Sequence, residues 1–219
     1  MNYYDIHTHA PATNPEDYVV ISADIHKPII SSGLHYSLGI HPWYINYNLA
    51  ETTRLLFEKV REYSLHPTVV ALGETGLDKI TAKTTNDFQF QQTLFTLHAK
   101  LSEEIKKPLI VHCVRGWDEL LRIRQSVNPF MPWIIHGFKG KSPLAKQLLN
   151  AGFYLSFGQH YHKESLLAAW TNHRLLIETD KNHINIRDVY QQLSNDLNIT
   201  VNELSVEIDF FFHQFFPLR

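Results

Sequence analysis

Short apolar runs alternate with longer amphipathic stretches along most of this chain. Five runs rich in isoleucine, valine, leucine and phenylalanine predict buried strands at residues 69–72, 109–112, 133–136, 153–157 and 175–178. Stretches with helical periodicity predict helices at residues 86–105, 117–127, 144–150, 164–172, 186–197 and 201–215. Thr200 and Glu203 have the spacing of a capping box at the start of the last helix. Strands that alternate with helices indicate βαβ units and a parallel sheet.

The first third of the chain is less regular. Apolar runs at residues 3–9 and 34–40 predict two more strands, and residues 18–22 are a weaker candidate. With that candidate the chain has the eight strands that close a TIM-type (β/α)8 barrel. The segment between His9 and Leu34 is too short for two crossover helices, so we expect a compact α/β barrel with shortened early helices. An open doubly wound sheet is the alternative, but no glycine-rich phosphate loop supports it.

The composition is that of a globular protein, with 44% hydrophobic and 19% charged residues. No linker or repeat interrupts the chain, so residues 1–219 are predicted to form a single domain. Cys113 is the single cysteine, which excludes an internal disulfide and makes a reducing cytoplasm the simplest location. No apolar run approaches the ~20 residues of a membrane span, and the first residues lack the features of a signal peptide. The net charge of -2 does not favour nucleic acid through the field of the whole molecule, although it leaves room for a local cationic site.

Metal-capable side chains recur where the predicted strands end. His7 and His9 end the first strand and project to the same side, because side chains two residues apart in a strand do so. The other candidates end or closely follow later strands: Glu74, His112, His136 and Asp180. A barrel gathers the carboxyl ends of its strands on one face, where active sites lie. The six residues therefore predict one metal site, and polar capping of the strands is the competing explanation.

Seven short motifs follow one another along the chain. They are Asp5-Ile-His-Thr-His9, Gly39-Ile-His-Pro42, Gly73-Glu-Thr-Gly-Leu-Asp78, Ile110-Val-His112, Ile135-His-Gly-Phe138, Tyr154-Leu-Ser-Phe-Gly158 and Leu176-Ile-Glu-Thr-Asp180. In these motifs and in their order the chain resembles the TatD family of metal-dependent deoxyribonucleases, within the amidohydrolase-type barrels. The resemblance covers nearly the whole chain, and its strength lies in the ordered set rather than in any single motif.

The resemblance implies that the protein binds one or two divalent metal ions, such as Mg, Mn or Zn. It implies that His7, His9, Glu74 and Asp180 hold one ion. It also implies that Glu74, His112 and His136 hold a second, with Glu74 as the bridge. Two neighbouring cations can polarise a phosphoryl oxygen and activate water. Asp180 and Glu74 are then the expected catalytic residues, with Asp180 as the general base.

Three features depart from the family pattern and bear on the substrate. The arginine after His112 is Arg115, whereas many relatives carry it two residues after the histidine. Asp180 is followed by Lys-Asn-His instead of Ala-Pro-Tyr, and the early helices are shortened. Cationic side chains nevertheless follow the ligand-bearing strands, and such side chains position phosphates. The residues predicted to bind substrate are Arg115, Lys139, Lys141 and His41, and DNA is the expected substrate.

The leading interpretation is a TatD-type metal-dependent hydrolase, a phosphodiesterase or deoxyribonuclease that uses metal-activated water. One alternative is another amidohydrolase-superfamily enzyme that acts on a small ester, amide or phosphoester. A PHP-type phosphoesterase also opens with a His-x-His pair, but its closing Asp-x-His motif is absent because residue 182 is Asn. The remaining alternative is a non-catalytic binding protein, against which the full ligand set argues. The sequence predicts no protein partner and no membrane association.

Overall fold

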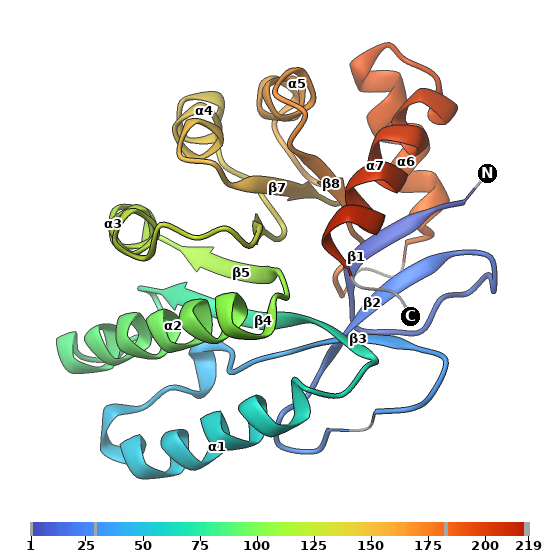
Figure 1. Ribbon diagram of the computed structural model, residues 1–219. Coiled ribbons are helices and arrows are strands. Elements are labelled where there is room, and N and C mark those ends of the chain that lie inside the picture. The colour runs from blue at the N-terminus through green and yellow to red at the C-terminus, as the bar shows by residue number, and fades with distance from the viewer. Residues whose placement is uncertain (1, 29, 182–183, 217–219) are drawn as a thin grey trace. The chain divides into compact units, whose positions relative to one another are not determined.

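The computed structural model of this chain describes residues 2–28, 30–181 and 184–216 (Figure 1). The fold is of the α/β class, and its eight strands follow chain order from β1 to β8. Contacts within the chain divide it into two compact units. The described part of the terminal unit consists of residues 2–21, 134–181 and 184–216, and that of the central unit consists of residues 22–28 and 30–133.

The central unit is built around β4 (Val69–Asp78), whose residues are all buried. This strand pairs in parallel with β3 (His35–Leu38) and with β5 (Leu109–Val114). The apolar runs in β4 and β5 suit strands of a parallel sheet, which is covered on both faces. Gly76 lets β4 approach β5 closely, because a Cβ at this position would collide with the backbone oxygen of His112.

Helices follow the strands of the central unit in sequence. They are α1 (Ala50–Tyr63), α2 (Thr85–Ile105) and α3 (Trp117–Val127), with two short 3-10 helices, η1 (Pro42–Tyr44) and η2 (Tyr47–Leu49), before α1. α2 packs on β4 and α3 packs on α2. A capping box starts α2, because the side chains of Thr84 and Asp87 each accept a hydrogen bond from the other residue's backbone N–H.

The terminal unit has parallel strands of its own. They are β1 (Tyr4–Thr8), the first residues of β2 (Tyr18–Ala23), the last residues of β6 (Trp133–Ile135), β7 (Tyr154–Phe157) and β8 (Leu175–Ile177). β1 pairs with β2, and β7 pairs with both β6 and β8. An isolated parallel bridge joins Thr8 to Asp180 and so ties the end of β1 to the segment after β8.

Among the residues that the structure describes, four helices complete the terminal unit. They are α4 (Ser142–Asn150), α5 (Lys163–Thr171), α6 (Ile186–Leu197) and α7 (Val201–Phe215). In Figure 1, α4 lies beside α5 and α6 beside α7, in agreement with their contacts. α7 packs on β1 and β8, where Phe211, Phe212 and Phe215 are buried. No helix among the described residues is both long enough and apolar enough to cross a membrane.

The predicted elements are confirmed over most of the chain. Helices α3, α6 and α7 have the predicted bounds, and the capping box at Thr200 and Glu203 is present. The shortened early helices are confirmed, since the described residues between β1 and β3 contain no helix. The predicted end of β4 at residue 72 is wrong, because the strand continues to Asp78 and Glu74 therefore lies inside it. The single domain stays a prediction.

Candidate metal-binding groups

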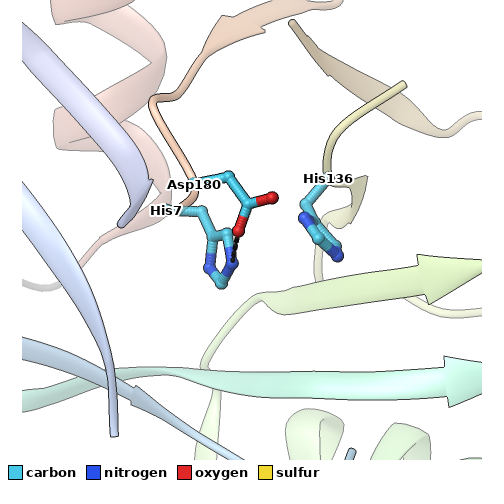
Figure 2. A group of neighbouring side chains, drawn as sticks. All are labelled: His7, His136 and Asp180. Atoms are coloured by element: carbon cyan, nitrogen blue, oxygen red, sulfur yellow. Dashed lines mark ion pairs between the residues drawn. The ribbon is translucent and has the colours of Figure 1, made fainter. Parts of the chain in front are cut away.

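Three metal-capable side chains converge in the terminal unit (Figure 2). His7 lies in β1, His136 follows β6 and Asp180 follows β8, and each offers a ligand atom within 4.8 Å of the others. His7 Nε2 is 3.6 Å from Asp180 Oδ1, and the ring centroids of His7 and His136 are 4.5 Å apart. His9 joins them, because its Nε2 lies 3.4 Å from the same carboxylate oxygen. These four residues are called the terminal group.

Backbone hydrogen bonds hold Asp180 beside β1. Its amide donates to the carbonyl oxygen of His7 at 2.9 Å, and the amide of His9 donates to the carbonyl oxygen of Asp180 at 3.3 Å. Asp5 braces the same corner by accepting hydrogen bonds from the hydroxyl and amide of Thr179 and from the amide of His7. Burial raises the pKa of Asp5 to about 7, against the opposing effect of the hydrogen bonds from Thr179. Main-chain hydrogen bonds thus hold His7, His9 and Asp180 next to one another.

The carboxylate of Asp180 is held in its ionised form. Burial alone would raise the pKa of Asp180, but hydrogen bonds from His7 and His9 outweigh it, and the charge of His136 adds to their effect. The pKa of Asp180 therefore lies well below its usual range. A carboxylate that stays ionised in the acid range is available at neutral pH either to bind a cation or to accept a proton.

A second buried carboxylate orients His136. Glu178 is only 1% exposed, and its Oε1 lies 3.4 Å from His136 Nδ1. A proton on Nδ1 shared with this carboxylate leaves the lone pair of His136 Nε2 for a ligand. Histidines that bind metal ions are usually backed by a carboxylate or carbonyl in this way, which fixes the tautomer and raises the basicity of the ring.

The central unit also contains metal-capable side chains. His41 directly precedes η1, Glu74 lies in β4 and His112 lies in β5, and their ligand atoms are within 4.8 Å of one another. Glu74 Oε1 is 3.5 Å from His41 Nε2 and 3.9 Å from His112 Nδ1. The other oxygen, Oε2, accepts a hydrogen bond from the hydroxyl of Ser22 at 3.4 Å. His41, Glu74 and His112 are called the central group.

Asp78 contacts His112 in the same way as Glu178 contacts His136. Asp78 Oδ2 lies 3.4 Å from His112 Nε2 and accepts a hydrogen bond from the indole N–H of Trp43 at 2.8 Å. Burial alone would raise the pKa of Asp78, but hydrogen bonds from Trp43, two backbone amides and His112 outweigh it and lower the pKa. A proton on His112 Nε2 shared with Asp78 leaves Nδ1, which faces Glu74, for a ligand.

His41 has a different hydrogen-bonding pattern. Its Nδ1 accepts a hydrogen bond from the backbone amide of Trp43 at 3.2 Å, which favours the tautomer with its proton on Nε2. That proton faces Glu74, so the neutral ring acts there as a donor and not as a ligand. The geometry therefore agrees better with the expected substrate-binding role of His41 than with metal ligation.

The terminal group suits a divalent cation, as do Glu74 and His112 of the central group. Imidazole nitrogens and carboxylate oxygens are ligands of Zn and Mn, and carboxylates with water are ligands of Mg. Two ligands ~2.0–2.2 Å from one ion are at most ~4.4 Å apart, so a span of up to 4.8 Å needs only a small closure to receive an ion. The buried carboxylates behind His136 and His112 are a further feature that metal sites share.

The structure distributes the predicted site residues over both units. His7, His9, His136 and Asp180 lie in the terminal unit, and Glu74 and His112 lie in the central unit. It brings His136 together with His7 and Asp180, whereas the resemblance assigned His136 to the same ion as Glu74 and His112. The predicted substrate-binding residues Arg115, Lys139 and Lys141 are all exposed.

Sequence reasoning gave no role to Asp78 and Glu178. Both lie in the motifs that carry the family resemblance, and Glu178 directly follows β8. The available signal was an acidic residue among positions that are buried. Burial of a carboxylate costs free energy unless the carboxylate has hydrogen-bonding or charged partners. The motif itself does not reveal that each carboxylate faces one ring nitrogen of a particular histidine.

Comparisons with known proteins agree on one family. The family model of TatD related DNases matches residues 7–216. An uncharacterized metal-dependent hydrolase of Buchnera aphidicola is 36% identical over 155 residues, which are 68% of this chain and 56% of the relative. The human 3'-5' RNA nuclease TATDN2 is 30% identical over 166 residues, which are 72% of this chain and 21% of the nuclease. This chain thus spans less than two thirds of the length of these relatives.

A solved structure shows the fold class. The TatD homolog YJJV of Escherichia coli K12 superposes with a TM-score of 0.79 at 19% identity, over 99% of this chain and 98% of the homolog. The expected α/β barrel of the TIM type is confirmed by this likeness and by the order of the strands. The family match extends over nearly all of the chain and includes the motifs that carry both groups. This chain therefore belongs to the TatD related DNase family.

Proposed function

We propose that this protein hydrolyses phosphodiester bonds in nucleic acid, with DNA as the expected substrate, and that it uses one or two divalent ions of Mg, Mn or Zn. The observation that carries the proposal is that each group of histidines and carboxylates has a buried carboxylate behind one of its histidines. The family supports a nucleic-acid substrate, since its model describes DNases and the human relative is named an RNA nuclease.

In the terminal group, His7, His9, His136 and Asp180 are the proposed ligands. A divalent cation held by such residues polarises a phosphoryl oxygen and lowers the pKa of water. Asp180 is ionised at neutral pH because its histidine neighbours depress its pKa. We assign Asp180 the role of general base that the family resemblance implies, since its carboxylate lies beside the proposed ligands His7 and His9.

In the central group, Glu74 and His112 are the proposed ligands, and His112 is oriented by Asp78. The bridging role of Glu74 stays a prediction from the family resemblance. We assign to His41 a hydrogen bond from its Nε2–H, which lies beside Glu74, to a substrate oxygen, in keeping with its tautomer. Arg115, Lys139 and Lys141 are proposed to position phosphates, because they are exposed cations close in sequence to proposed ligands.

A panel of substrates tests the proposal. The purified protein is supplied with Mn²⁺ or Mg²⁺ and offered single-stranded DNA, duplex DNA, RNA, a small phosphodiester, a neutral ester and a lactone. We expect cleavage of phosphodiesters that stops on chelation and is strongly reduced in Asp180→Asn, which also controls for contaminating nucleases. Turnover of the ester or lactone with every phosphodiester left intact would refute the nuclease proposal and favour a small-molecule amidohydrolase.

A further inference from the structure

Large aromatic side chains lie exposed next to the central group. Trp43 and Tyr44, both in η1, are 57% and 53% exposed. The ring centroid of Trp43 is 4.7 Å from that of His41 and 6.1 Å from that of His112, in edge-to-face arrangements. A tryptophan is usually largely buried, so an indole this exposed beside two histidines of a candidate site calls for a reason.

The exposed indole is held in a fixed position. Its N–H donates to Asp78 Oδ2 at 2.8 Å, and Asp78 is only 4% exposed. The same oxygen lies 3.4 Å from His112 Nε2, so one buried carboxylate connects Trp43 to a proposed metal ligand. The hydrogen bond is made by the edge of the indole, and it orders the ring. A ring ordered in advance loses little conformational freedom when a ligand packs on it.

We propose that Trp43 is a stacking platform for an unpaired nucleobase next to the phosphate that binds at the central group. This inference rests on the proposed function and names the part of the substrate that the site recognises. A base is one sugar away from its own phosphate, so a ring in contact with His41 and close to His112 is within its reach. Every base has a π-face, so such stacking tolerates any sequence.

The occupant is a base from single-stranded nucleic acid. In a duplex both faces of a base are already stacked on neighbouring bases. The indole can therefore stack on a base only where the strand is single or frayed. A lone phosphate or a small neutral ester would make no use of a fixed aromatic surface. The platform thus predicts a preference for single strands over duplexes, as well as a dependence on the presence of a base.

Binding of labelled oligonucleotides tests the platform. Fluorescence anisotropy is measured with a single strand, with the same strand carrying one abasic site at each position in turn, and with a duplex. The variants are Trp43→Ala, Trp43→Phe and, as a matched control, Tyr47→Ala, because Tyr47 is 52% exposed and its ring packs against Phe90. The additional substitution Asp180→Asn slows cleavage so that binding can be measured with Mn²⁺ present, and KM values of the variants without it give an independent reading.

We expect Trp43→Ala to weaken binding of the intact strand by about 5- to 150-fold, the range for the loss of one base stack. Trp43→Phe keeps a ring and retains most of the affinity, and Tyr47→Ala binds as the wild type does. One abasic position should abolish the difference between wild type and Trp43→Ala. The comparison of intact and abasic strands separates loss of stacking from indirect damage. A disturbed Asp78 or His112 would weaken binding of both kinds of strand alike.

Equal losses on intact and abasic strands, or no loss at all, would overturn the platform while leaving the proposed function in place. A wild-type protein that neither binds nor cleaves any oligonucleotide would overturn both.

Discussion

Replacing Asp78 by Asn probes how the buried carboxylate orients a proposed ligand. Asp78 Oδ1 accepts hydrogen bonds from the amides of Ile80 and Thr81, and the amide oxygen of Asn can keep both. The new NH₂ group then occupies the place of Oδ2, where it faces the indole N–H of Trp43 and His112 Nε2. Donors thus meet donors, and the negative charge that holds the proton on His112 Nε2 is lost.

The size of the effect follows from these contacts. A hydrogen bond to a charged group contributes about 1.5–3 kcal/mol to stability, so Asp78→Asn should lower the free energy of unfolding by an amount in this range. Loss of the carboxylate behind a ligating histidine typically costs about 10- to 100-fold in metal affinity. That factor corresponds to about 1.4–2.7 kcal/mol of binding free energy.

Calorimetric titration of the metal-free protein with Zn²⁺ measures the affinity, and urea unfolding measures the stability. Asp87→Asn is the matched control, because Asp87 belongs to the capping box of α2 in the same unit and not to the central group. It should cost about 0.5–2 kcal/mol of stability, as the loss of a helix cap does, without a change in metal affinity. Wild-type zinc affinity in a folded Asp78→Asn would refute the proposed role of Asp78.

Three further outcomes are expected. Asp180→Asn should lower the rate of phosphodiester hydrolysis by ~10²- to 10⁴-fold, as the loss of a general base does; a rate within threefold of wild type in a steady-state assay would exclude that role. Lys139→Ala combined with Lys141→Ala should weaken binding of single-stranded DNA and reduce the slope of log affinity against log salt by about 1.4, or ~0.7 for each lost phosphate contact; an unchanged slope would remove both lysines from the substrate site. Burial lowers the pKa of His98 from 6.5 to about 4, so as the pH falls the unfolded chain binds a proton at this histidine before the folded chain does. The free energy of unfolding should therefore be highest above pH 6.5 and fall by about 3 kcal/mol as the pH drops toward 4. An NMR titration of the His98 ring with a midpoint near 6.5 would contradict this.

The elements that the sequence predicted well have strong, regular patterns. α6 and α7 carry broad apolar faces and clear caps at Asn185 and Thr200, so both their existence and their ends were readable. α1 was missed although it buries Thr53, Phe57 and Val60, which is more than the single residue that α3 buries. β4 was predicted too short because its second half contains glycines and acidic residues that are rare in strands.

The candidate site was predictable in its residue types and in part of its pairings, since His7 and His9 were expected beside Asp180, and Glu74 beside His112. Histidines and carboxylates at strand ends pointed to metal binding, because parallel strands place these ends on one face. Sequence spacing could not show that His136 lies beside His7 or that Glu178 faces His136, since these contacts join segments far apart in the chain. The tautomer of His41 depends on a hydrogen bond from the backbone of Trp43, which only the folded conformation reveals.

The central claim is that cations bound by these histidines and carboxylates are required for cleavage of nucleic acid. The most direct measurement strips the protein with EDTA, removes the chelator and follows cleavage of a labelled single-stranded oligonucleotide while Mn²⁺ is added back. The account predicts no cleavage by the stripped protein and recovery as Mn²⁺ binds, with no recovery in a His7→Ala, His136→Ala double variant that remains folded. Cleavage that persists in the stripped protein, or that returns equally in the double variant, would contradict it.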